Sequence, residues 1–161
     1  MKKLIFVRHS KAEDPSADIS DFERSLTTKG KTLASTMALR LREKEKSAGV
    51  IITSPAFRAI ETALIFAGIF RIPADQILLA GNIYYKLNFQ TLQEELARVK
   101  EETEIVTLFG HNPSFTELAG ELSKESFGFM PKCAIAGLTF KITTWSELSR
   151  NSGEIEYYLK P

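Results

Sequence analysis

Basic and imidazole side chains follow three short apolar segments of this sequence. They are Arg8 and His9 after residues 4–7, Arg58 after residues 50–53, and His111 after residues 105–109. The chain has only two histidines, and both belong to this set. Guanidinium groups bind phosphate oxygens through paired, charge-assisted hydrogen bonds, and a neutral imidazole is a good nucleophile toward phosphorus. These residue types therefore predict a site in which Arg8, Arg58 and His111 hold a phosphoryl group that His9 attacks.

The three apolar segments have the composition of strands that are buried on both faces of a parallel sheet. Segments with helical periodicity separate them, and residues 134–142 and 154–159 look like an antiparallel pair at the sheet edge. The sequence thus predicts an α/β fold, a three-layer sandwich whose mostly parallel sheet has an antiparallel edge. Because ligands bind outside the carboxyl ends of parallel strands, we expect the four basic side chains to converge there.

Two helix starts are predicted beside the same site. Ser54-Pro55 and Asn112-Pro113 each combine an N-cap residue with a proline at the first helical position. Arg58 would then lie in the first turn of its helix. Helix N-termini attract anions, so both helix starts favour a phosphate site.

Composition limits the classes of partner and cofactor. With 21 Lys and Arg against 20 Asp and Glu, the net charge of +1 predicts neither a nucleic-acid nor a membrane partner. No Cys, Asp or Glu stands at zinc-ligand spacing from either histidine, and Lys29-Gly30-Lys31 lacks the Walker pattern, so we expect no metal and no cofactor. The single cysteine suits a cytoplasmic protein, and the length suits one domain, residues 1–161, and a monomer.

Four segments resemble the histidine phosphatase superfamily, which has the phosphoglycerate-mutase-like fold. They are residues 7–12, residues 21–27, residues 54–59 with Thr62, and residues 110–113. Over its whole length the chain is similar to the small SixA-like branch of phosphohistidine phosphatases. The resemblance implies that His9 is the phosphorylated nucleophile and that Arg8, Arg58 and His111 form the phosphate pocket.

The resemblance also implies further site residues. Arg24 would contact substrate at the rim of the pocket, and Ser10 and Asn112 would contribute to phosphate or substrate binding. Many members carry a glutamate proton donor where this chain has Asn82. Because an amide cannot protonate a leaving oxygen, Asp21 becomes the candidate proton donor.

The substrate stays open between three possibilities. Residues 68–104 leave room for little beyond a loop and one helix, so an open pocket is expected to admit phosphohistidine on a protein, such as a phosphotransfer domain or carrier. The alternatives are a phosphatase of small phosphorylated metabolites and a catalytically weak phosphate-binding signalling module, which Asn82 favours. Tyr84 and Tyr85 are interpreted as packing residues rather than as a substrate surface.

Overall fold

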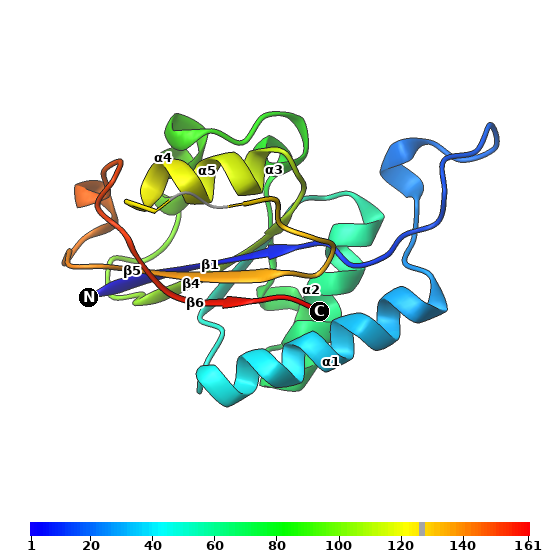
Figure 1. Cartoon of the computed structure of the whole chain (residues 1–161), viewed down its shortest axis with the longest axis horizontal. Coiled ribbons are helices and arrows are strands. Elements are labelled where there is room, and N and C mark those ends of the chain that lie inside the picture. The colour runs from blue at the N-terminus through cyan, green and yellow to red at the C-terminus, as the bar shows by residue number, and fades with distance from the viewer. Residues whose placement is uncertain (126–127) are drawn as a thin grey trace.

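The computed structural model describes residues 1–125 and 128–161, which form one mixed sheet between two layers of helices (Figure 1). In these ranges the sheet has six strands in the order β3-β2-β4-β1-β5-β6. They are β1 (Lys2–Arg8), β2 (Val50–Thr53), β3 (Leu78–Leu79), β4 (Ile105–Gly110), β5 (Ile135–Phe140) and β6 (Glu154–Leu159). The strands from β3 to β1 are parallel, and β5 runs antiparallel to β1 and β6. The predicted mixed sheet with an antiparallel edge is confirmed.

The helices lie in two layers. They are α1 (Thr28–Lys44), α2 (Phe57–Phe70), α3 (Gly81–Tyr85), α4 (Phe89–Leu96) and α5 (Ser114–Leu122), with 3-10 turns at Asp21–Glu23, Ala74–Gln76 and Trp145–Glu147. Figure 1 shows α1 and α2 on one face of the sheet and α3, α4 and α5 on the other. Within the described ranges, no helix is both long enough and apolar enough to cross a membrane.

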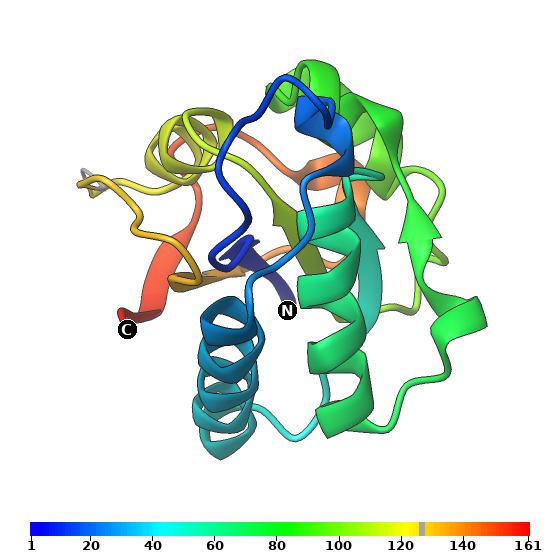
Figure 2. The ribbon, with the colours of Figure 1, turned by 90° about the vertical axis from the view of Figure 1, so that its right-hand side faces the viewer.

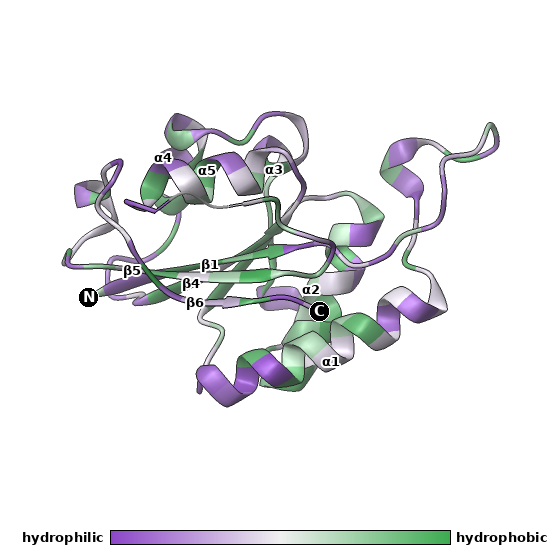
Figure 3. Ribbon diagram, viewed as in Figure 1, coloured by the Kyte–Doolittle hydropathy of each residue, from purple (hydrophilic) through white to green (hydrophobic). Residues whose placement is uncertain are grey.

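Alternating side chains of β1 supply both layers of the core. Ile5 and Val7 pack with α1 and α2, whereas Leu4 and Phe6 pack with the helices of the opposite face. This explains the continuous apolar run of β1, because both faces of a central parallel strand are buried (Figure 3). The core on both faces therefore holds β1 in the middle of the sheet, with its carboxyl end among the carboxyl ends of the other parallel strands.

A close approach between α1 and the segment after β1 positions that segment. A Cβ atom on Gly30 would lie 2.0 Å from the backbone oxygen of Lys11, so only glycine fits at this contact. The Ser10 hydroxyl donates to the Gly30 carbonyl at 2.7 Å, and the Ser10 N–H donates to Thr62 Oγ1 at 3.1 Å. Ser10 is thus tied to both α1 and α2 directly behind His9.

Both predicted helix starts were wrong, that of α2 by two residues and that of α5 by one. The N-cap of α2 is Ala56, and that of α5 is Pro113. Ser54 and Asn112 do not cap because other partners use their side chains: Ser54 contacts His111, and Asn112 contacts Met130 and Thr116. Arg58 nevertheless lies in the first turn of α2.

Residues 68–104 hold more structure than the sequence predicted. Besides α4, which starts at Phe89 instead of about residue 91, they form the short strand β3 and the short helix α3. Ala80 donates its N–H to the Thr53 carbonyl at 2.9 Å, which brings α3 to the carboxyl end of β2. The segment therefore supplies one wall of the site.

Candidate active site

The carboxyl ends of two adjacent parallel strands, β1 and β4, bring the two histidines together. His9 follows β1 and donates its N–H to the Gly110 carbonyl at 3.0 Å, at the end of the neighbouring β4. The His9 and His111 rings are 5.1 Å apart. Figure 2 looks onto this end of the sheet, where the loop after β1 and the start of α2 meet. Residues far apart in the sequence thus form one cluster.

His9 has the tautomer and the charge state of a nucleophile. Its Nδ1 lies 2.7 Å from the Ser10 carbonyl oxygen, which can only accept, so Nδ1 carries the proton and Nε2 keeps a lone pair. The side chain is about 5% exposed. The pKa of His9 is lowered to about 3, chiefly by burial and also by the charges of His111, Arg58 and Arg8, against the opposing hydrogen bond to Ser10. The ring is therefore neutral at pH 7.

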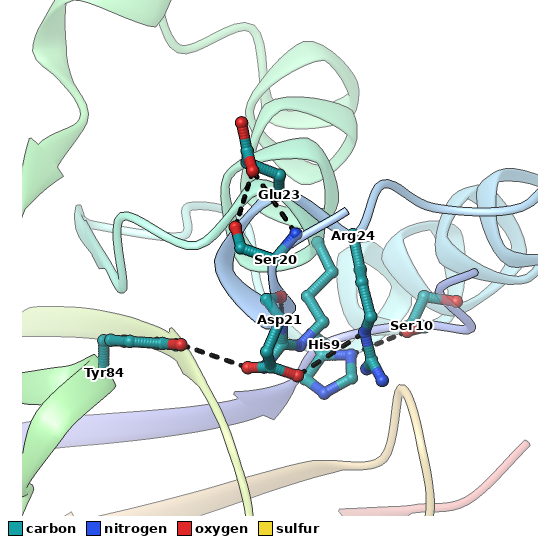
Figure 4. A network of polar contacts seen from close by, with 8 residues as sticks. His9, Ser10, Ser20, Asp21, Glu23, Arg24 and Tyr84 are labelled. Atoms are coloured by element: carbon teal, nitrogen blue, oxygen red, sulfur yellow. Dashed lines mark hydrogen bonds and ion pairs between the residues drawn. The ribbon is translucent and has the colours of Figure 1, made fainter. Parts of the chain in front are cut away.

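Arg58 and Arg24 meet at the Asp21 carboxylate. Figure 4 shows Arg24 and Tyr84 at this carboxylate. Arg58 Nη2 donates to Asp21 Oδ2 at 3.0 Å, and Arg58 Nη1 donates to the Asp21 backbone oxygen at 2.6 Å. Arg24 Nε forms an ion pair with Asp21 Oδ1 at 3.5 Å. The Tyr84 hydroxyl also donates to Asp21 Oδ2, at 3.1 Å. Asp21 is thus an internal anion placed on the arginines that the sequence assigns to phosphate.

The electrostatic surroundings of Asp21 favour its ionised form. Burial raises the pKa of the carboxyl group, but the hydrogen bond and the charge of Arg58 outweigh that effect, with help from Tyr84 and Arg24, so the pKa is lowered overall. In this state Asp21 carries no proton to give. A role as proton donor requires that the phosphoryl group first take over its arginine partners.

Four buried nitrogen atoms at this site have no hydrogen-bond partner. They are Arg8 Nε, Arg24 Nε, Arg58 Nε and His111 Nδ1, and in the described ranges no other buried side-chain nitrogen or oxygen lacks one. An unsatisfied buried donor costs about 1–3 kcal/mol, so such atoms rarely gather by chance. A bound anion with several acceptor oxygens would satisfy them.

Arg8 is anchored by the segment that precedes β5. Its Nη1 donates to the Met130 carbonyl at 2.8 Å, and Asn112 Nδ2 donates to the same oxygen at 3.0 Å. The other end of the Asn112 amide accepts from Thr116 at 3.0 Å. Asn112 therefore contributes to the site by holding the Met130 carbonyl that anchors Arg8, since both ends of its amide already have protein partners.

Ser54 is a site residue that the sequence analysis missed. His111 Nε2 lies 2.7 Å from Ser54 Oγ, and Ser54 Oγ also accepts from the Ala56 N–H at 3.2 Å. Burial and then the Arg58 charge lower the pKa of His111 to about 4, so this ring is also neutral at pH 7. The signal was present in the sequence, because Ser54 directly follows a buried strand just as His9 and His111 do.

Tyr84, predicted as a packing residue, also reaches the site. Its ring lies 5.7 Å from the His111 ring, and its hydroxyl contacts Asp21 as described above. The neighbouring Asn82 donates from Nδ2 to Glu95 Oε1 at 3.1 Å, and Glu95 is a buried residue of α4. The α3 segment thus presents a phenol to the site, while its amide is held by a carboxylate behind it.

Comparisons with known proteins show the family and the fold of this chain. Residues 4–125 match the family model of the histidine phosphatase superfamily (branch 1). An uncharacterised protein from Picosynechococcus is 31% identical over 139 residues, 84% of each chain. The structure of the protein histidine phosphatase SixA complexed with tungstate has a TM-score of 0.82 and 22% identity over 98% of this chain and 96% of that one. A structure described as SixA from Agrobacterium tumefaciens has a TM-score of 0.81 and 21% identity over 99% and 98% of the two chains.

The structural likeness extends over β5 and β6, which lie beyond the residues matched by the family model. The fold is therefore the phosphoglycerate-mutase-like fold throughout the described residues. With the family model matching residues 4–125, the chain belongs to the histidine phosphatase superfamily and is a phosphatase.

Proposed function

We propose that this protein removes the phosphoryl group from phosphohistidine on another protein, through a phosphohistidine intermediate on its own His9. The observation that carries the proposal is the set of four buried nitrogens without a hydrogen-bond partner around a neutral imidazole. Three guanidinium groups and His111 offer donors to the peripheral phosphoryl oxygens. His9 Nε2 remains free for phosphorus.

The first step transfers the phosphoryl group. The lone pair of His9 Nε2 forms a bond to phosphorus while the N–P bond of the substrate breaks, and the electron pair of that bond stays on the departing imidazole. His9 is neutral and its Nδ1–H is held by the Ser10 carbonyl, so the attacking nitrogen needs no deprotonation. The fixed guanidinium groups stabilise charge on the equatorial oxygens.

The second step returns the enzyme to its starting form. Water attacks phosphorus, the P–Nε2 bond breaks, and the electron pair returns to His9. We assign the proton from this water to Asp21, which Arg58 keeps ionised and therefore able to accept a proton. The protonated Asp21 can then supply the proton that the next departing imidazole takes up.

Asn82 supports an N–P substrate over an alkyl ester. An alkoxide leaves poorly without a general acid, and Asn82 donates to Glu95 and offers no proton. The imidazole of phosphohistidine can leave after protonation at its far nitrogen.

We also retain the sequence-based proposal of a cytoplasmic protein, because the thiol of buried Cys133 suits a reducing compartment.

Substrate competition tests this proposal. Chelator-treated protein is incubated with free phosphohistidine, an aryl phosphate and an alkyl phosphate, and kcat/KM is compared. We expect turnover without metal in the order phosphohistidine, aryl phosphate, alkyl phosphate. A preference for the alkyl ester would favour a metabolite phosphatase, and phosphate binding without turnover would favour a signalling module.

A further inference from the structure

Three aromatic side chains are strongly exposed among the residues that the structure describes. Phe57 is 42% exposed, Tyr85 80% and Phe129 70%. They come from three segments, which are the first residue of α2, the last residue of α3 and the loop before β5. Single exposed apolar residues are ordinary on a protein surface, but several around one site mark an interaction surface.

All three aromatics connect to the phosphate site through ring contacts. The Phe129 ring lies 5.1 Å from the guanidinium carbon of Arg8. Tyr85 packs 5.0 Å from Tyr84, whose ring lies 5.7 Å from the His111 ring. Phe22 also packs against Tyr84, at 5.2 Å, and Phe57 packs against Phe22, at 6.1 Å. The exposed aromatics thus stand around the mouth of the site.

A groove continues this surface beside Phe129. It has a volume of about 470 Å³ and is lined by Asn112, Pro113, Thr116, Glu117 and Phe129. Asn112 follows His111 directly and shares the Met130 carbonyl with Arg8. The groove therefore opens next to the phosphate site and offers a second contact area outside it.

A small substrate leaves most of this surface unused. Phosphorus must reach His9, which is almost fully buried. Tyr85 is separated from His9 by two intervening rings, because His9 contacts His111, His111 contacts Tyr84, and Tyr84 contacts Tyr85. A free phosphorylated amino acid contacts at most the inner rings. Only a larger partner covers Tyr85, Phe57 and Phe129 while its phosphoryl group lies at His9.

We propose that Phe57, Tyr85 and Phe129 form a docking surface for a folded protein domain that presents its phosphorylated histidine to His9. This inference rests on the proposed function and adds the surface that selects the substrate. Aromatic side chains contribute much of the binding energy of protein interfaces. Apolar residues that surround a central polar contact, here the phosphoryl group at His9, also shield that contact from water. The partner is expected to carry apolar side chains around its phosphohistidine.

The test compares two substrates with the same reactive bond. The first is a histidine phosphotransfer domain charged with phosphoramidate, and the second is free phosphohistidine. The variants are Tyr85→Ala, Phe129→Ala and their combination, with Tyr85→Phe as the conservative change. Leu39→Ala is the matched control, because Leu39 is 54% exposed but lies near the far end of α1.

The expected result is a change in selectivity. Each alanine variant should reduce kcat/KM for the phosphorylated domain about tenfold more than for free phosphohistidine, and the double variant about a hundredfold more. Tyr85→Phe should keep most of the selectivity, and Leu39→Ala should keep all of it. An equal loss for both substrates, or no loss for either, would overturn the docking surface.

Two further outcomes bear on the same inference. If the wild-type protein processes the phosphorylated domain no better than free phosphohistidine, the surface does not dock this class of partner. If the alanine variants convert a dimer into a monomer in sedimentation, a second copy of this chain occupies the surface instead. Failure of the proposed function looks different, since free phosphohistidine would then not be hydrolysed at all.

Discussion

Replacement of Asp21 by asparagine should make the protein bind phosphate-like anions more tightly. In the structure the Asp21 carboxylate accepts from Arg58 and forms an ion pair with Arg24, so an incoming anion must displace it from both. The asparagine side chain has similar size but no charge. The variant therefore removes an internal competitor without emptying the space.

The size of the effect follows from the exposure of the pair. The Asp21 side chain is 56% exposed and that of Arg58 only 7%, so solvent screens the interaction from one side. Exposed ion pairs contribute up to about 1 kcal/mol. Removing this one should tighten binding of tungstate or orthophosphate by about fivefold at low salt. The gain should shrink as salt screens the charges.

Isothermal titration with tungstate measures this change. Asp18→Asn is the control, because Asp18 lies in the same loop and is exposed, so it removes one charge at a distance from the arginines. Tyr84→Phe removes only the phenol hydrogen bond to Asp21. If Asp21→Asn binds tungstate no tighter than Asp18→Asn does, the carboxylate does not compete for the anion site and the reasoning is refuted.

Three other perturbations test separate parts of the account. Since burial depresses the pKa values of His9 and His111, the folded protein binds fewer protons than the unfolded chain between about pH 4 and 6.5. Urea unfolding should therefore show that the free energy of unfolding falls with decreasing pH, by up to about 1.4 kcal/mol per pH unit for each histidine. The variant His111→Gln should have a flatter slope. Ser54→Ala should lower kcat/KM about tenfold or more and shift the ¹⁵N signals of His111 to those of the other tautomer. Ser54→Thr should restore both. Unchanged ¹⁵N signals in Ser54→Ala would show that Ser54 does not set the tautomer of His111. Gly110→Ala should cost about 1–3 kcal/mol of unfolding free energy, because its Cβ would lie 2.6 Å from both Ile83 and Phe115, whereas Gly81→Ala, with nothing within 4 Å, should cost far less.

Most of the fold could be predicted because its central strands are buried on both faces. The apolar runs of β1, β2 and β4 are too short and too continuous for amphipathic helices, and each ends at a polar turn. Their parallel arrangement then places Arg8-His9 and His111 at one edge of the sheet. The sequence positions of these residues were enough to predict that they meet.

The remaining site residues depend on tertiary contacts. Ser54 has the sequence signature of a helix cap, yet its hydroxyl contacts His111, and that choice depends on β2 and β4 being neighbours. Tyr84 lies on a helix of five residues, too short for a periodic pattern, and reaches Asp21 only because β3 brings α3 to the edge of the sheet. The sequence shows that Ser54 follows a buried strand but not that its hydroxyl contacts His111, and it carries no signal for Tyr84.

The most direct test of the central claim is to trap the phosphorylated enzyme and locate the phosphoryl group. Metal-free protein is mixed with phosphohistidine or phosphoramidate, quenched at alkaline pH and examined by ³¹P NMR and peptide mass spectrometry, beside His9→Ala with its folding checked by thermal unfolding. The account predicts a phosphoryl group on Nε2 of His9, since Nδ1 donates to the Ser10 carbonyl, and none in the variant. Labelling at His111, or turnover that persists in His9→Ala, would contradict it.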